Sequence, residues 1–494
     1  MKKYKNVIAI FKQKNECEKI ILGLIIIFGF LIRIFLLKEI PSEIWGDVNE
    51  HFIYAKEILK GSLKFDFWAG DGPLFDYWVA LIFKIFGRSF ETIKLSSVLI
   101  GTLTIFTTYL YAKELFKNKK IAFLAAFFTA FSFWSISLSR QAKPYILTPL
   151  FLTLFLYFFI KKRYFFAGFF LGLGMWTQAS FWGLFFFSFL NLRLFIFSLI
   201  FAFPLFWQII FSKDNYFSGS FTYLGEKIGF GLSFFEKIKI IFFNLWRNFL
   251  SFFLKGDPVF RHNIPYRPTL DFLTAIFFLI GLILLVKETL NKKNRKKYIF
   301  FLFLPLYFGQ FASNLDVVLS NTPSIGRMLT ISPIIYLISS FGFFKIYEKI
   351  KGNYLKNLFL FLSLFFVFFI NIFDYFLVYP KKLPNGNLPF SLYISENILK
   401  EKKVSNFYLI ECCWGEWGQP EPKSIINRLD EKRKITFLNK EEIFTNQCYF
   451  KKGFYYFDPN DYILINYFRN CGLEKKLIFF EKKGVKIFGR LEID

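Results

Sequence analysis

The sequence predicts a polytopic α-helical membrane protein with about eleven transmembrane helices, followed by a small α/β domain outside the membrane. Of its 494 residues, 54% are hydrophobic and only 20% are charged, whereas a soluble globular protein has roughly 25% charged residues. Apolar runs of membrane-spanning length recur along residues 20–379, which we take as the transmembrane domain. Residues 380–494 are more polar and alternate helix-like with strand-like runs.

The first apolar run, residues 20–37, follows a basic and polar start at residues 1–19. It is long enough to span the membrane, so we expect an anchor here and no cleaved signal peptide. Ten further spans are predicted at 92–112, 121–138, 145–160, 164–178, 180–192, 194–211, 270–286, 298–315, 327–344 and 357–379. The stretch 164–211 has no clear loops, and we interpret it as three spans, two of them short and packed inside the bundle.

The formal net charge of +27 would suggest nucleic acid binding in a soluble protein. Here the basic clusters lie between the apolar runs, as in cytoplasmic loops of membrane proteins, so no nucleic acid partner is expected. If the N-terminus (1–19) is cytoplasmic, the predicted cytoplasmic segments together contain 24 Lys or Arg and five Asp or Glu. These segments are 1–19, 113–120, 161–163, Arg193, 287–297 and 345–356. The outside loop 38–90 contains six Lys or Arg and eight Asp or Glu. This asymmetry supports a cytoplasmic N-terminus for a protein of the inner (plasma) membrane. Because the number of predicted spans, eleven, is odd, the C-terminal domain is expected to be extracytoplasmic.

Two segments are too polar to lie in lipid, the outside loop 212–269 and the tail 380–494. The tail begins with a linker rich in Pro, Gly and Asn. Four runs are typical of strands, VSNFYLIECCW, KITFLN, YILINYF and KLIFFEKKGVKIFGRLE, and two of helices, SLYISENILKEKK and PKSIINRLDEKR. We therefore predict a small extracytoplasmic α/β domain.

Four of the five cysteines lie in this tail: Cys412, Cys413, Cys448 and Cys471. An extracytoplasmic position is compatible with a disulfide, although chain neighbours such as Cys412 and Cys413 seldom pair. No CxxC motif or Cys/His cluster indicates a metal, so no metal ligands are assigned.

Acidic and aromatic residues are interleaved in the first outside loop, with Asp47, Glu50, Asp71 and Asp76 among the acids. Exposed acids are usually solvated, and aromatics at an interface usually form a belt. Asp47 differs because it follows the first span closely and begins the helix-like run VNEHFIYAKEIL. This position predicts one carboxylate at the mouth of a membrane cavity.

Arg140 and Lys143, followed by Tyr145, form the outside turn between the third and fourth spans. Two cations at the outer face depart from the positive-inside rule, and a buried cation requires an anionic partner. They contact either lipid headgroups or the phosphate of a substrate.

Arg327 begins the tenth span, and Arg261 and His262 lie in the second outside loop. An Arg at a helix start in an apolar setting suits a phosphate better than Lys does, and the alternative is a snorkelling headgroup contact. His262 is expected to be a hydrogen-bonded loop histidine rather than a metal ligand.

In order and spacing these motifs resemble the GT-C superfamily of membrane glycosyltransferases, in particular the branch of protein mannosyltransferases and lipid A aminoarabinose transferases (family 39-like). The resemblance covers about residues 20–345. The matching positions are Asp47, Ala55 and Gly61, then Gly72-Pro73-Leu74, then Ser139-Arg140, then Arg261 to Asp271. Val48 departs from the pattern, because many members have Glu at this position. Either Glu50 or Asn49 takes over part of the function of that Glu, or the function is absent here. Asp71 and Asp76 are both candidates for the second carboxylate of the family pattern.

The resemblance implies an inverting transfer of a sugar from a polyprenyl-phosphate donor to an acceptor hydroxyl. Asp47 would be the general base, and Arg140, Lys143 and Arg327 would bind the donor phosphate. The candidates for substrate binding are Glu50, Asp71, Asp76, Tyr145, Arg261 and His262. No cofactor is required and no metal is indicated, although some relatives bind one in this loop. The sugar and the acceptor (protein, lipid or glycan) stay open.

The alternative function is a flippase or other transporter of lipid-linked saccharides, which would also have many spans and interfacial cations. Transporters often show repeated halves and charges near the bilayer midplane. The sequence has no internal repeat, and its charges outside the loops lie mainly at span ends. A scaffold or receptor is a third class, but eleven spans exceed what anchoring requires. These observations favour the enzyme.

Overall fold

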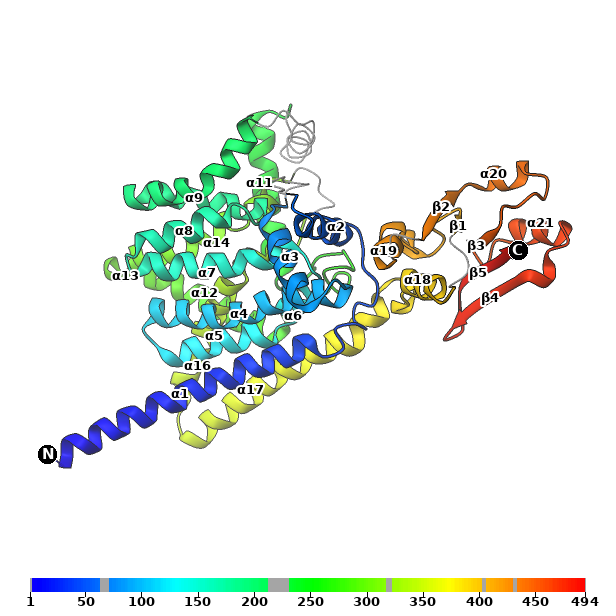
Figure 1. The fold of residues 1–494 in the computed structure, drawn as a ribbon. Helices are drawn as coiled ribbons and strands as arrows, with labels where there is room; N and C mark the ends of the chain where they lie inside the picture. Colours follow the sequence, from blue (N-terminus) through cyan, green and yellow to red (C-terminus); the bar gives the residue numbers. More distant parts are fainter. Residues whose placement is uncertain are drawn as a thin grey trace. The chain divides into compact units, whose positions relative to one another are not determined.

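The computed structural model describes residues 2–62, 71–211, 231–316, 322–401, 406–429 and 433–493 (Figure 1). The chain divides into two compact units. The first comprises Met1–Leu37 and Ala55–Tyr379 and is helical. The second comprises Lys38–Tyr54 and Pro380–Asp494 and contains the five-stranded sheet.

Every predicted span falls on helical segments of the first unit (Figure 1). These segments are α1 (Lys2–Ile34), α4 (Phe90–Phe116), α5 (Lys119–Phe131) with α6 (Phe133–Leu138), η1 (Pro144–Ile146) with α7 (Leu147–Ile160), α8 (Tyr164–Gly174), η2 (Ala179–Leu190), α9 (Leu192–Phe211), α12 (Phe272–Leu290), α13 (Lys292–Tyr298) through α14 (Leu304–Phe308) and α15 (Phe311–Asn314), α16 (Ser332–Lys349) and α17 (Asn353–Phe373). The mostly helical fold with a small C-terminal sheet is thereby confirmed.

Within the described part of the chain, four helical stretches are long and apolar enough to cross a membrane. They are Phe90–Phe116, Phe272–Leu290, Leu329–Lys349 and Asn353–Lys382. Four further apolar helices of the described residues are shorter, namely Pro144–Ile160, Tyr164–Gly174, Ala179–Leu190 and Leu192–Trp207. The predicted span 121–138 is interrupted at Ser132, which ends α5 and caps α6. The total of eleven spans therefore stays a prediction.

The predicted outside loops contain helices of their own. The expected helix after the first span is α2 (Asp47–Leu59), whereas α3 (Leu74–Phe86) and α11 (Phe234–Ser251) were not foreseen. The start of α11 is fixed by a capping box, in which Ser233 and Glu236 each accept a backbone N–H of the other. A loop that is polar on average thus contains an amphipathic helix.

Glycines set the distance between two helices of the bundle. A Cβ at Gly281 of α12 would lie 2.0 Å from the carbonyl oxygen of Ile338 in α16, and one at Gly342 would lie 2.0 Å from that of Phe277. The two backbones therefore touch, as small residues allow at helix crossings in membranes.

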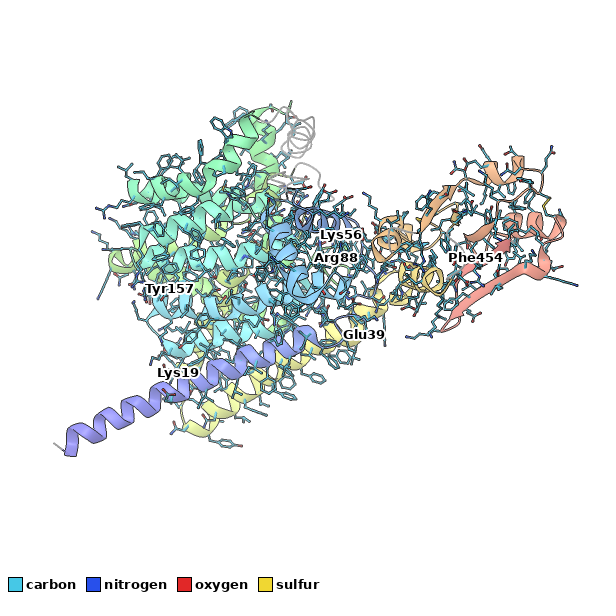
Figure 2. The ribbon with its side chains drawn as sticks, in the orientation of Figure 1. Lys19, Glu39, Lys56, Arg88, Tyr157 and Phe454 are labelled. Carbon is cyan, nitrogen blue, oxygen red and sulfur yellow. A yellow bond between two sulfur atoms is a disulfide. The ribbon has the colours of Figure 1, made fainter. Side chains whose placement is uncertain are left out.

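Aromatic side chains also pack between the helices, among them Tyr157 of α7, which Figure 2 labels. The ring of Tyr157 lies 5.1 Å from that of Phe158 in an edge-on arrangement, and that of Phe158 stacks on Phe166 and Phe170 of α8. Such pairs are the favourable geometries of aromatic rings. The many phenylalanines thus have a packing role.

The C-terminal domain has a mixed sheet with strand order β2-β1-β3-β5-β4. β1 pairs in parallel with β2 and β3, and β5 pairs antiparallel with β3 and β4. The strands are β1 (Asn406–Ile410), β2 (Lys434–Leu438), β3 (Gly453–Phe457), β4 (Leu477–Lys482) and β5 (Val485–Ile493).

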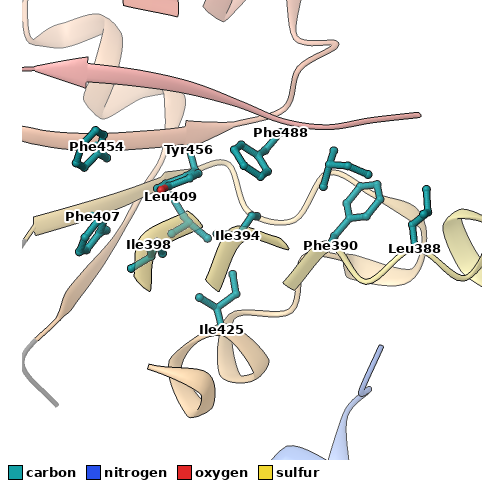
Figure 3. Close-up of a cluster of buried hydrophobic side chains, with 11 residues drawn as sticks. Leu388, Phe390, Ile394, Ile398, Phe407, Leu409, Ile425, Phe454, Tyr456 and Phe488 are labelled. Atoms are coloured by element: carbon teal, nitrogen blue, oxygen red, sulfur yellow. The ribbon is translucent and has the colours of Figure 1, made fainter. Parts of the chain in front are cut away.

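Helices cover both faces of this sheet. Phe407 and Leu409 of β1 pack with α18 (Phe390–Lys400) and α19 (Pro422–Arg428) in the cluster of Figure 3. Tyr408 and Ile410, which alternate with them, pack on the other face with α20 (Lys440–Thr445) and α21 (Tyr462–Asn470). The result is a three-layered α/β/α domain.

The prediction of a strand for YILINYF was wrong, because this run forms α21. Its tyrosines and isoleucines favour strands, but the buried residues Leu464, Ile465 and Phe468 have helical spacing, and Asp461 caps the helix by accepting the N–H of Leu464 at 3.2 Å. Cys448 is bonded to Cys471. Cys412 and Cys413 are also joined, against the expectation that such neighbours seldom pair.

Candidate active site

Asp47 is the first residue of α2 and belongs to the unit that contains the C-terminal domain. Its side chain is half-buried, and the next residue, Val48, is buried at 5% exposure. Gly46 before it has φ 56°, a left-handed conformation that favours glycine. A carboxylate in the first turn also interacts favourably with the helix dipole.

Residues of the C-terminal domain contact the chain on both sides of Asp47. Oε2 of Glu421 accepts the N–H of Gly46 at 2.9 Å, and Lys423 forms an ion pair with Glu50. The predicted substrate-binding candidate Glu50 therefore has a protein partner, and its role toward a substrate stays a prediction.

Glu43 is a second carboxyl in this region, only 2% exposed. Its Oε2 accepts the N–H of Ser391 at 2.9 Å, and its Oε1 accepts that of Ile44 at 3.1 Å. Burial raises the pKa of Glu43, and Arg428 and these hydrogen bonds only partly oppose the effect. Burial raises the pKa of Glu421 as well, and the nearby Glu43 contributes to this rise.

These raised pKa values predict that the protein loses stability as pH rises. Below the ordinary carboxyl pKa of 4.5, Glu43 is protonated in both the folded and the unfolded chain. Above it, the unfolded chain ionises first and is stabilised, so the free energy of unfolding falls until the folded carboxyl has ionised too. Glu43→Gln resembles the protonated form and should be more stable than wild type at pH 8 but not at pH 4. Thermal unfolding in detergent across this range checks the prediction; equal differences at both pH values would contradict it.

In the helical unit, Arg140 is fully buried at the end of α1. Its Nη1 donates to the carbonyl oxygens of Arg33 at 2.8 Å and Phe35 at 2.6 Å, and its Nη2 donates to that of Leu36 at 2.6 Å. The Arg33 carbonyl belongs to the last turn of α1, where carbonyls lack intrahelical partners, and Phe35 and Leu36 directly follow the helix. The described contacts of Arg140 thus cap α1, and its predicted role at a donor phosphate is untested.

Three further predicted residues are also buried: Lys143 at 4% exposure, and Asp71 and Asp76 at 6% each. Asp71 forms an isolated antiparallel bridge with Gln178, and Asp76 lies in the first turn of α3. The choice between the two aspartates as second carboxylate stays open.

His262 lies beside a buried acid. Nδ1 of His262 is 3.3 Å from Oδ2 of Asp257, a residue with no exposed surface. The same carboxylate accepts the N–H of Val259 at 2.8 Å and that of Ile325 at 2.9 Å. Asp257 therefore ties the loop that carries His262 to the segment before Arg327.

Tyr145, His262 and Gly326 come together from three distant parts of the sequence. The rings of Tyr145 and His262 are 5.9 Å apart and edge-on. A Cβ at Gly326 would lie 2.9 Å from the Tyr145 ring and 3.3 Å from Cε1 of His262, so a side chain there would displace one of them. Three of the predicted segments are thus adjacent in the fold.

Arg327 follows Gly326 and forms an ion pair with Asp316, whose side chain is 1% exposed. The Arg327 side chain is 22% exposed. Arg261 contacts Tyr379 through its main chain, since its carbonyl oxygen accepts the Tyr379 hydroxyl at 3.0 Å. Arg327 is thus the predicted phosphate ligand that is least buried.

Sequence reasoning did not single out Glu43, Asp257, Asp316 or Glu421. It also passed over Arg33, which lies within the first apolar run and donates to the carbonyl oxygens of Ala130 at 2.7 Å and Thr129 at 3.0 Å. A charge inside an apolar run was the available signal. In the part of the chain that is described, His, Cys, Asp and Glu side chains do not gather in threes that would hold a metal ion.

Residues 71–207 match a family described as dolichyl-phosphate-mannose-protein mannosyltransferase. The fold is similar to that of ArnT from Cupriavidus metallidurans bound to undecaprenyl phosphate, with a TM-score of 0.52 and 10% identity over 95% of this chain and 98% of that chain. It is also similar to the archaeal oligosaccharyltransferase AglB from Archaeoglobus fulgidus, in complex with an inhibitory peptide and a dolichol-phosphate, with a TM-score of 0.52 and 12% identity over 97% and 74%. No curated protein matches the sequence. The predicted resemblance to the GT-C superfamily, on the side of ArnT and the protein mannosyltransferases, is confirmed.

Proposed function

We propose that this chain is a glycosyltransferase that moves a sugar from a polyprenyl-phosphate donor to an acceptor hydroxyl at the outer face of the plasma membrane. The observation that carries the proposal is the fold shared with two solved proteins, one bound to undecaprenyl phosphate and one to a dolichol-phosphate. The match of residues 71–207 to a dolichyl-phosphate-mannose-dependent family points to the same donor class. The N-terminus would be cytoplasmic and the C-terminal domain extracytoplasmic.

Asp47 is the proposed general base, which takes the proton of the acceptor hydroxyl as its oxygen attacks the anomeric carbon. The bond from that carbon to the phosphate oxygen breaks on the opposite side, so the sugar inverts. The leaving phosphate needs no proton, unlike the leaving group of an inverting glycosidase, and one base is therefore enough. Val48, where many GT-C members have Glu, is consistent with a single carboxylate at this position.

Cations would stabilise the charge that develops on the leaving phosphate. Arg327 is the first choice, because its side chain is 22% exposed although Asp316 neutralises part of its charge. Lys143 and Arg140 would contribute positive potential from buried positions. Tyr145 and His262, which lie next to Gly326, are proposed substrate contacts together with Arg261.

Transfer from a panel of synthetic polyprenyl-phosphate hexoses and pentoses, with the purified protein in nanodiscs, tests the proposal. We expect glycosylated product or hydrolysed donor with one sugar class, and the product also shows whether the anomeric configuration is inverted. No turnover across the panel, together with movement of a labelled lipid-linked sugar across vesicles containing the protein, would overturn the enzyme and favour the transporter.

A further inference from the structure

The C-terminal domain includes a short piece of the N-terminal region. Residues Lys38–Tyr54, called the Asp47 segment below, form one compact unit with Pro380–Asp494. This segment begins before Asp47 and includes the first turns of α2. The domain is therefore built around the stretch of chain that carries the proposed base.

Hydrogen bonds fix the part of the segment that precedes Asp47. Asn387 accepts the N–H of Ser42 through Oδ1 at 2.9 Å and its hydroxyl through the main-chain oxygen at 2.6 Å. Glu43 accepts the N–H of Ser391 at 2.9 Å, and the Oγ of that serine accepts the N–H of Glu421 at 2.8 Å. The buried Glu43 is thus linked through Ser391 to Glu421.

Residues in and next to α19 fix the main chain on both sides of Asp47. Glu421, which directly precedes α19, accepts the N–H of Gly46 at 2.9 Å. Nδ2 of Asn427 donates to the carbonyl oxygen of Asn49 at 3.3 Å. With the ion pair of Lys423 and Glu50, these contacts restrain positions 46, 49 and 50.

We propose that the C-terminal α/β domain positions Asp47 for catalysis, with Glu421 and Glu43 as positioning residues. This role rests on the proposed function, because it assumes that Asp47 is the base. A displacement of about 1 Å in a catalytic group costs roughly 100-fold in rate, and loops outside a scaffold are mobile. Carboxyls that accept backbone N–H groups fix the backbone itself, so they determine where α2 begins.

The test compares Glu421→Ala with wild type in the full-length protein. Loss of the bond to Gly46 should speed hydrogen–deuterium exchange of the Asp47 segment. It should lower kcat about 10- to 100-fold while the KM for the donor changes little, because the base is misplaced and the donor contacts remain. Glu421→Gln should largely rescue both readouts, because its amide oxygen accepts the same N–H.

The matched control is Glu401→Ala. It removes an equally charged side chain from the same domain and breaks the 2.8 Å contact with Nη1 of Arg490, but it leaves the contacts of the Asp47 segment intact. A surface variant guards against unfolding: the Lys423 side chain is 56% exposed. Lys423→Ala should therefore keep the domain folded and speed exchange around Glu50.

Each outcome bears on one proposal. If Glu421→Ala has the same hydrogen–deuterium exchange in the Asp47 segment and the same kcat as Glu401→Ala, the positioning role is overturned. If Glu421→Ala does not fold, unchanged exchange in Lys423→Ala overturns it instead. A wild-type protein that transfers no sugar overturns the proposed function, whereas the exchange measurement still decides whether the domain restrains the Asp47 segment.

Discussion

Asp47→Asn is expected to lower the rate of sugar transfer by roughly 100- to 10,000-fold, the usual contribution of a general base. Asn keeps the shape of Asp47 but cannot take the proton of the acceptor hydroxyl. Donor binding should be almost unchanged, because the carboxylate acts on the acceptor. The measurement is single-turnover product formation at saturating donor, beside an equilibrium binding assay with the same lipid.

Glu50→Gln is the matched control for this result. It removes a carboxylate from the same turn of α2, one that is already paired with Lys423. We expect a far smaller loss than for Asp47→Asn. Near wild-type transfer by Asp47→Asn would show that Asp47 is not the base, and a comparable loss in Glu50→Gln would show that the two acids share the task.

Arg327→Ala is expected to slow transfer about 100-fold or more, the typical effect of removing a preorganised donor of charge stabilisation. If the guanidinium stabilises charge on the leaving phosphate, the loss should appear mainly in kcat. It should also be smaller for donors with a better leaving group. Both expectations are checked by steady-state kinetics with two donors, a polyprenyl-phosphate sugar and an analogue that has a better leaving group.

The ion pair with Asp316 complicates this experiment, because the single variant leaves a buried carboxylate without its Arg327 partner. Breaking a buried pair in this way costs about 3–5 kcal/mol in stability. The double variant Arg327→Ala/Asp316→Ala removes both charges and should recover much of the lost thermal stability. If it also recovers transfer, Arg327 is structural, and the phosphate role fails.

Helix positions in the membrane unit could be predicted from the sequence, since apolar runs report burial in lipid directly. Lengths could not, because breaks such as Ser132 between α5 and α6 depend on a side chain that caps the next helix. In the C-terminal domain, residues that favour strands correctly predicted β1, whereas the same preference misassigned α21. Local residue preferences gave the wrong secondary structure for α21, because packing against the sheet determines that this run is helical.

The candidate site could be predicted only in part. Motif order pointed to Tyr145, His262 and the 326–327 region, which the fold brings together. The acids that support them, such as Asp257, carried no motif, and their significance comes from burial and from partners far along the chain. The same holds for Glu43, whose main partner Ser391 is 348 positions away.

The contacts around Asp47 also set an order for biosynthesis. Gly46 and Glu421 are 375 positions apart, and ribosomes add about 5–20 residues per second, so Glu421 is made roughly 20 to 75 seconds after Gly46. During this interval the nascent chain contains Asp47 without the groups that restrain it. On the proposed function, we therefore expect a chain that ends before α19 to transfer sugar no faster than Glu421→Ala, because it lacks the same restraint on Gly46.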